Sequence, residues 1–138
     1  MAEFIKRFLY LNGSLKRVTT EKSITNKTRK SVVAKSYKLC RSAGSKARGL
    51  MFTNESSVLS KALLFEFSSA RQQSLHMFFV FYSIDVLFLD DKKSVVDMKE
   101  GFKPFTAYTS RARSKYVIEL PRDTIKKSKT YVGDRLKW

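Results

Sequence analysis

The most apolar and aromatic stretch of the chain runs from Leu75 to Asp90. Before its final aspartate it contains three polar side chains, His76, Ser83 and Asp85. A β-rich run that is apolar on both faces is typical of core strands covered from two sides. The run is too short and too interrupted to span a bilayer, which needs about 20 apolar residues. The pattern therefore predicts two buried strands that meet near Tyr82 and Ser83.

Two further segments show clear strand patterns. Residues 94–98 follow the polar sequence Asp90-Asp91-Lys92-Lys93, and this arrangement predicts the second strand of a hairpin. Residues 115–120 alternate between apolar and polar positions, and Pro121 ends the pattern. The residues that share one face of this strand are Tyr116, Ile118 and Leu120.

Turn residues divide the rest of the chain into short elements. We expect a strand over 32–41, a short helix within 42–51 that Ser45 caps, loops at 54–57 and 68–74, a buried element over 59–67, and one helical turn from Asp123. Many short strands separated by turns are typical of sandwiches and barrels. The sequence therefore predicts a mainly β fold, α+β at the margin, as a small β-sandwich or barrel-like sheet with one or two short helices.

Charge divides the chain into two parts. Lys and Arg number 28 against 12 Asp and Glu, a net charge of +16, and residues 1–48 carry 13 of the basic and 2 of the acidic side chains. Residues 14–31 offer little apolar area to offset the entropy of ordering. We therefore expect residues 1–31 to form a basic arm or edge hairpin that is dispensable for folding, and residues 32–138 to form a single β-rich domain.

An excess of basic residues predicts an affinity for nucleic acid or another polyanion, and a solubilising surface is the alternative reading. Aromatic residues interleave with basic ones near Tyr37 and over 102–113, a pattern that suits single-stranded nucleic acid. The candidate polyanion-binding residues are Lys16, Arg17, Lys27, Arg29, Lys30, Lys35, Lys38, Arg41, Arg111 and Arg113.

Several classes of protein do not fit the sequence. One histidine and one cysteine exclude the usual zinc sites, and no phosphate loop or nucleophile elbow is present. We therefore expect no metal, no cofactor and no enzyme of a recognisable class. The single Cys40 indicates a reducing compartment, and Lys6 and Arg7 interrupt the only N-terminal apolar segment. These features predict a cytoplasmic protein without a secretory signal or a transmembrane segment.

Five groups of residues follow one another along the chain. They are Ala47-Arg48-Gly49-Leu50-Met51-Phe52, Ala62-Leu63-Leu64-Phe65-Glu66-Phe67, His76-Met77 with Ile84-Asp85-Val86-Leu87-Phe88-Leu89-Asp90, Tyr116-Val117-Ile118-Glu119-Leu120-Pro121, and Gly133-Asp134. In this order they resemble the domain of unknown function 192 family, in its archaeal-type form, over roughly residues 33 to 138. The resemblance implies a compact β-sandwich or barrel with a short helix near Gly49, and it implies no reaction. Bacterial members usually carry Trp, Thr and Pro where this chain has His76, Val80 and Ser83.

The matched motifs contain the candidate pocket residues, which are His76, Met77, Asp85, Arg48 and Glu119. A buried carboxylate needs hydrogen bonds or a cation, and the resemblance implies Arg48 as the partner of Asp85. We interpret that pair as structural. The leading hypothesis is a non-enzymatic binding or accessory module with polyanion affinity. The alternative is a small-ligand pocket, or a weak hydrolase-like site, around His76 and Asp85.

Overall fold

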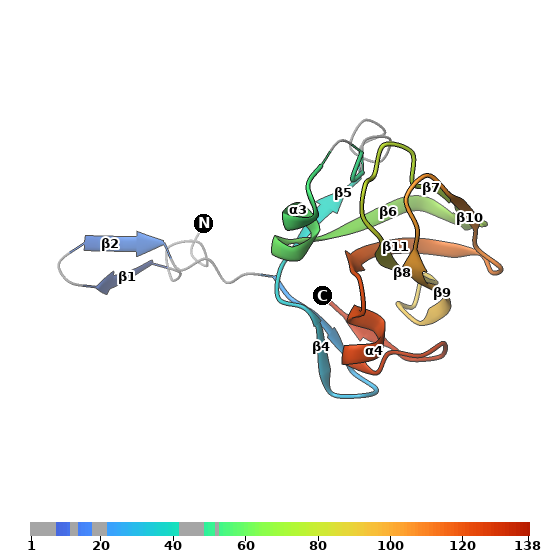
Figure 1. Ribbon diagram of the computed structural model, residues 1–138. Coiled ribbons are helices and arrows are strands. Elements are labelled where there is room, and N and C mark those ends of the chain that lie inside the picture. The colour runs from blue at the N-terminus through green and yellow to red at the C-terminus, as the bar shows by residue number, and fades with distance from the viewer. Residues whose placement is uncertain (1–7, 12–13, 18–21, 42–48, 52) are drawn as a thin grey trace.

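The computed structural model describes residues 8–11, 14–17, 22–41, 49–51 and 53–138 (Figure 1). Within this part the chain is mainly β with two short helices, as the sequence predicts, and its sheets are open rather than closed into a barrel. The expected helix within 42–51 lies outside the described residues except for 49–51, which form a turn.

A five-stranded sheet in the order β5-β6-β11-β8-β9 forms the centre of the fold. The strands are β5 Tyr37–Cys40, β6 Ala62–Arg71, β8 Ile84–Leu89, β9 Val95–Phe102 and β11 Ser114–Pro121. β5 runs parallel to β6, and the other neighbours are antiparallel. All six residues of β8 are buried, because β8 lies between β11 and β9 and both of its faces are covered. This confirms the core strand expected in the most apolar stretch.

One face of the central sheet packs against a second, three-stranded sheet in the order β12-β3-β4 and against helix α4 (Figure 1). These elements are β3 Ile24–Asn26, β4 Ser31–Ala34, α4 Thr124–Ser128 and β12 Leu136–Lys137. Ile24, Ile125 and Leu136 meet Ile118 and Leu120 of β11 in this core. The alternation expected over 115–120 is therefore confirmed, since Ile118 and Leu120 share this face.

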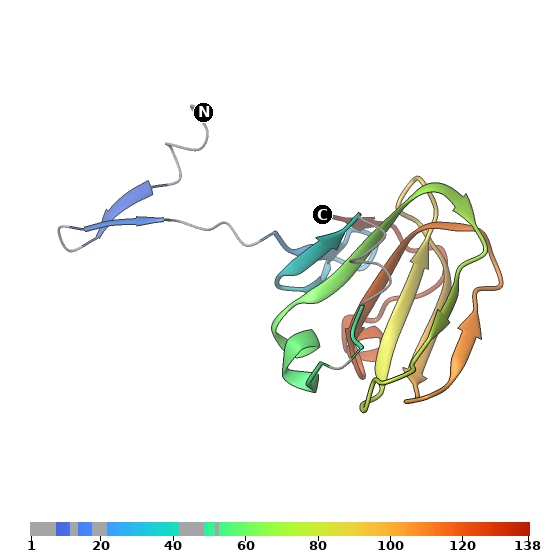
Figure 2. The same ribbon diagram turned by 90° about the horizontal axis from the view of Figure 1, so that it is seen from above.

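The opposite face of the central sheet is covered by short pieces of chain (Figure 2). They are helix α3 Glu55–Ser60, the turn at 49–51, the two-stranded sheet of β7 Ser74–His76 with β10 Ala107–Thr109, and the segment 77–83. Met77 and Val80 are buried against this face, together with Val58 of α3. A cover made of loops and short strands leaves room for a cavity between the cover and the sheet.

The segment between β7 and β8 corrects one expectation. The two strands of the apolar run do not meet near Tyr82 and Ser83, because residues 77–83 form an irregular loop. Phe79 has a φ of 57°, which no β-strand residue adopts, and three phenylalanines of the loop are exposed. High hydrophobicity here marks a surface loop that the sequence pattern alone did not separate from the core strand.

Three further boundaries differ from the expectations. The strand expected over 32–41 is two strands, β4 and β5, which belong to different sheets. Residues 55–57, expected as loop, begin helix α3, and β6 continues through residues 68–71. The hairpin at 90–98 and the helical turn after Asp123 are confirmed by β8, β9 and α4.

The N-terminal residues fall into two groups. β1 Phe8–Leu11 and β2 Ser14–Arg17 pair with each other as an antiparallel hairpin. β3 instead pairs with β4 and with β12 near the C-terminus, and Ile24 is fully buried. Asn26 is also buried and donates hydrogen bonds to Thr130 Oγ1 and Asp134 Oδ2. These contacts join β3 to the C-terminal part of the chain. That residues 1–31 form a basic arm or edge hairpin dispensable for folding stays a prediction.

Candidate functional site

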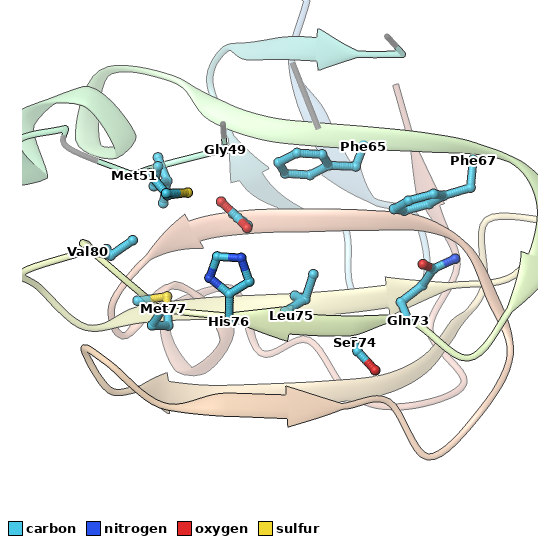
Figure 3. A pocket seen from close by; sticks show the side chains of 12 residues that line it. Gly49, Met51, Phe65, Phe67, Gln73, Ser74, Leu75, His76, Met77 and Val80 are labelled. Carbon is cyan, nitrogen blue, oxygen red and sulfur yellow. The ribbon is translucent and has the colours of Figure 1, made fainter. Parts of the chain in front are cut away.

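A cavity of about 300 Å³ lies between the central sheet and its cover of short elements. The residues that line it are Gly49, Leu50, Met51, Phe65, Phe67, Gln73, Ser74, Leu75, His76, Met77, Val80 and Glu119. Figure 3 shows Phe65 and Phe67 on the wall formed by β6, facing His76 and Leu75 from β7. Most of the wall is apolar, so the few polar side chains decide what the cavity can recognise.

Glu119 occupies an apolar position in the middle of β11. It lies opposite Leu63 of β6 and Val86 of β8, so both neighbouring strands offer aliphatic side chains. Because side chains alternate along a strand, Glu119 shares the face of Val117 and not that of Ile118 and Leu120. Val117 belongs to the core beneath the cavity. The fold therefore places the carboxyl group of Glu119 in surroundings that usually contain an aliphatic side chain.

One oxygen of the Glu119 carboxyl lacks a hydrogen-bond partner in the described part of the chain. Its Oε2 atom is buried and has no hydrogen-bond partner among the residues that the structure describes. Burial raises the pKa of Glu119 from 4.5 to about 7, because the charged form loses its hydration. Near neutral pH this carboxyl can therefore either donate or accept a hydrogen bond.

The other buried acids of the core differ from Glu119. Asp97 and Asp134 each accept hydrogen bonds of 2.8–3.0 Å. The donors to Asp97 are Arg111 N, Tyr108 Oη and Met98 N, and those to Asp134 are Arg29 Nε, Asn26 Nδ2 and Tyr131 N. Burial alone would raise the pKa of both carboxyls, but these hydrogen bonds lower both pKa values below their ordinary range. Their roles are explained by structure alone, whereas that of Glu119 is not.

Asp85 is also a structural acid, because both of its carboxyl oxygens accept hydrogen bonds from the backbone. Its Oδ1 accepts a hydrogen bond from Gly101 N at 3.0 Å, and its Oδ2 accepts one from Ile125 N at 2.9 Å. Gly101 has a φ of 55° next to a shift in the β8–β9 register, and Ile125 lies in the first turn of α4. One buried carboxylate thus fixes a bulge in β9 and the start of a helix. It does not line the cavity.

His76 lies at the end of β7 and is exposed at the rim of the cavity. Its Nδ1 accepts a hydrogen bond from Phe78 N at 3.3 Å, and its ring stacks on Phe78 with centroids 4.8 Å apart. A neutral ring that accepts at Nδ1 carries its proton on Nε2. Figure 3 shows the ring directed into the cavity, so His76 supplies one N–H donor from the rim.

Gln73 provides a further polar group. It is buried, and its Nε2 donates to Ser114 O at 3.2 Å. This hydrogen bond fixes the amide, and Figure 3 shows its oxygen on the side of the cavity. With Glu119 and His76, the cavity therefore combines one carboxyl, one ring N–H and one amide oxygen in an apolar wall. Such a set suits a small molecule with a polar end and an apolar body.

The structure brings together some of the pocket residues suggested by the sequence and separates others. His76, Met77 and Glu119 line one cavity, Asp85 lies outside it, and Arg48 is not among the described residues. Gln73 was missed, because a polar residue in an expected loop gives no sequence signal. Within the described ranges, no three His, Cys, Asp or Glu residues are grouped so that they could hold a metal ion.

The basic candidates are dispersed over the molecule. Arg29 is bound to Asp134, and Arg41 Nε contacts Glu66 Oε2 at 2.6 Å. Lys35 and Lys38 are exposed around the start of β5, Arg111 and Arg113 are exposed between β10 and β11, and Lys16 and Arg17 lie in β2. Lys27 and Lys30 are exposed in the turn between β3 and β4.

That turn forms part of a larger basic surface, which we define as Lys27, Lys30, Lys126, Lys127, Lys129 and Arg135. All six are exposed, and hydrogen bonds hold their segments together: Lys27 N donates to Arg135 O at 2.9 Å, and the Ser31 Oγ donates to Ser128 O at 2.7 Å. The one acid in residues 27–30 and 126–135 is Asp134, which is buried and already bound to Arg29. The candidate residues suggested by the sequence do not include the four cations of this surface that follow residue 125.

No helix in the described part of the chain is long and apolar enough to cross a membrane.

Comparison with known proteins identifies relatives over most of the chain. Residues 24–138 match the DUF192 family, described as uncharacterised ACR. A UPF0127 protein from Thermococcus sibiricus is 35% identical over 117 residues, which is 83% of this chain and 73% of that protein. A UPF0127 protein from Pyrococcus horikoshii is 38% identical over 93 residues, 67% of this chain and 78% of that protein.

Two solved structures share the fold. A Sinorhizobium meliloti protein, suggested to be a transcription regulator, superposes with a TM-score of 0.67 at 25% identity and covers 73% of this chain and 79% of its own. A Novosphingobium aromaticivorans protein of unknown function superposes with a TM-score of 0.69 at 17% identity and covers 84% and 82%. The matched residues 24–138 also contain all the motifs that suggested the family from sequence. The chain belongs to the domain of unknown function 192 family.

Proposed function

We propose that the protein is a non-enzymatic binding module that holds a small molecule in the cavity beneath β7. The observation that carries this proposal is the buried Glu119 carboxyl, whose Oε2 has no partner among the described residues. A buried polar atom without a partner destabilises a fold by about 1–3 kcal/mol, and a ligand that provides the missing hydrogen bond recovers this free energy. The ligand therefore needs a polar group for Glu119 and an apolar body for the walls.

A thermal-shift screen followed by calorimetry tests the cavity. Molecules that combine a hydrogen-bonding group with a small apolar body are expected to raise the melting temperature, because they bind the folded state. For any such molecule, Glu119→Leu should weaken binding about tenfold or more, since it removes a hydrogen bond to a buried polar group. Glu55→Leu changes an exposed glutamate of α3 and serves as the matched control.

A second variant makes this test independent of Glu119. Leu75→Trp places a larger side chain in the cavity wall and should exclude the same molecules. Ligands that bind equally well to this variant and to wild type would show that the cavity is not their site. The proposal would then fail even though the protein binds small molecules.

The basic surface supports a second candidate function, the binding of nucleic acid. Residues 27–30 and 126–135 contain one acid, Asp134, and it is already paired with Arg29. No acid of these two segments therefore neutralises the six exposed cations. The suggested role of the Sinorhizobium meliloti relative in transcription agrees with such a partner. Phosphate neutralisation releases counterions, so affinity for a single strand should fall with a log–log slope of roughly −0.7 per phosphate contact.

Fluorescence anisotropy with a labelled single-stranded oligonucleotide at two salt concentrations tests this candidate. Lys126→Gln combined with Lys127→Gln should weaken binding and reduce the salt slope by about 1–1.5, because two phosphate contacts are lost. Lys61→Gln combined with Lys103→Gln removes the same charge from exposed lysines outside the basic surface and should leave the slope nearly unchanged. Equal effects of the two double changes would assign the binding to net charge alone.

A further inference from the structure

Four phenylalanines form an exposed group on two neighbouring loops. Their exposed fractions are 49% for Phe78, 45% for Phe79, 65% for Phe81 and 51% for Phe105. The ring of Phe105 contacts the rings of both Phe79 and Phe81 edge to face, with centroids 6.1 and 5.4 Å apart. We call these four residues the phenylalanine patch. Contiguous exposed apolar groups of this kind usually mark an interaction site.

The backbone holds the phenylalanine patch in a fixed arrangement. Met77 N donates to Thr106 O at 2.7 Å, and Phe105 N donates to Met77 O at 2.8 Å, so the two loops are tied together. Phe79 and Phe105 both have a φ of 57°, a region that bulky residues rarely adopt and that the surroundings must enforce. Figure 2 shows the loops after β7 and β9 next to each other at one end of the central sheet.

The same loop contains buried residues, which shows that exposure of the phenylalanines is selective. Met77 and Val80 pack into the core, while Phe78, Phe79 and Phe81 between and beside them remain outside. The loop is therefore anchored by two side chains and presents three others to the solvent. Phe78 also stacks on His76, so the patch adjoins the rim of the cavity.

The size of the patch favours a lipid surface over a protein. The exposed fractions add up to roughly two whole phenylalanine residues, or about 400 Å². A standard protein interface needs about 800 Å² on each partner, so the patch alone is too small for a stable dimer. Insertion of a few aromatic side chains into the boundary between headgroups and acyl chains requires no complementary surface.

The charge around the patch selects the kind of lipid. Residues 77–83 carry no formal charge at neutral pH, and residues 103–106 contain one charged side chain, the exposed Lys103. The whole chain has a net charge of +16, and anionic headgroups attract nearby lysines. We infer that the phenylalanine patch inserts into the surface of an anionic membrane, with Lys103 at the headgroups. This inference goes beyond the ligand-binding function and does not depend on it.

Vesicle co-sedimentation of the full chain tests the inference. Wild type should bind vesicles of phosphatidylcholine with phosphatidylserine, and bind phosphatidylcholine alone much more weakly. Phe81→Ser combined with Phe105→Ser should reduce binding to the anionic vesicles about tenfold or more, because two inserted rings are lost. Val32→Ser combined with Val132→Ser removes apolar side chains of similar exposure, 57% and 56%, outside the patch and should bind like wild type.

A tryptophan reporter separates insertion from charge attraction. Phe81→Trp should shift its emission to the blue with anionic vesicles, whereas the native Trp138 gives the baseline in wild type. Two results would overturn the inference: wild type that does not bind anionic vesicles, or a double phenylalanine variant that binds as wild type does. A protein that fails to bind vesicles but self-associates, with the double variant monomeric, would assign the patch to a second copy instead.

Discussion

Asp85→Ala is expected to lower the free energy of unfolding by about 3–5 kcal/mol. The carboxylate is buried and accepts hydrogen bonds from Gly101 N and Ile125 N, at 3.0 and 2.9 Å. Hydrogen bonds to a charged group contribute about 1.5–3 kcal/mol each, and the substitution leaves two buried N–H groups without an acceptor. The loss should therefore exceed that of an ordinary core truncation of similar size.

Urea denaturation monitored by circular dichroism measures this effect. Asp91→Ala removes the same charge from an exposed position in the β8–β9 turn and should change the unfolding free energy by less than about 0.5 kcal/mol. Asp85→Asn keeps one acceptor oxygen but turns an NH₂ group toward the other N–H, so an intermediate loss is expected. An Asp85→Ala protein as stable as wild type would show that these two hydrogen bonds do not hold β9 and α4.

The pairing of Asp85 with Arg48 stays a prediction. Both acceptor oxygens of Asp85 already receive backbone hydrogen bonds, so the carboxylate is satisfied without a cation. If Arg48 nevertheless contributes, Arg48→Ala should destabilise wild type but have little further effect in the Asp85→Ala background. Additive losses would show that the two residues act independently.

Hydrophobic periodicity predicted the central sheet well and the loops around it poorly. β8 and the alternating face of β11 follow directly from the pattern, because each apolar position there is buried by neighbouring strands. Residues 77–83 are as apolar as β8, yet three of their phenylalanines are exposed. Periodicity reports which residues avoid water on average, and it cannot identify apolar residues that the fold leaves exposed on the surface.

The candidate sites depend on contacts between distant parts of the chain, which the sequence does not reveal. Ile24 is buried because β3 pairs with β12, more than a hundred residues away, and the basic surface joins residues 27–30 to 126–135 by the same pairing. Glu119 was recognised within a family motif. Its special environment arises only when β7 and the turn at 49–51 cover that face of β11.

The second large effect concerns the pH dependence of stability through Glu119. Its pKa is about 7 in the folded protein and near 4.5 when exposed, so the folded state holds a proton that the unfolded state releases between these values. The free energy of unfolding that protonated Glu119 contributes is therefore fully present below about pH 4.5. It decreases as the pH rises from there, and it is lost once the pH has passed through about 7. The difference of more than two pH units corresponds to a loss of about 3 kcal/mol.

Glu119→Gln should abolish this loss, because an amide of the same shape does not ionise. The variant is expected to match wild type at low pH and to exceed its unfolding free energy by up to about 3 kcal/mol above pH 8. Urea denaturation of both proteins across this range gives the difference curve. The difference cancels the contributions of Asp97 and Asp134, whose lowered pKa values stabilise the fold as pH rises in both proteins.

The shape of the difference curve also shows whether a cation compensates the Glu119 carboxyl in the folded protein. A flat curve would mean that Glu119 ionises at its ordinary pKa because a cation outside the described residues, such as Arg48, compensates it. Repeating the comparison in the Arg48→Met background decides between these cases, since the pH dependence should then emerge. A curve that begins to rise near pH 4.5 and levels off near pH 7 in the native background would instead establish an uncompensated carboxyl, which a ligand with a hydrogen-bond donor can satisfy.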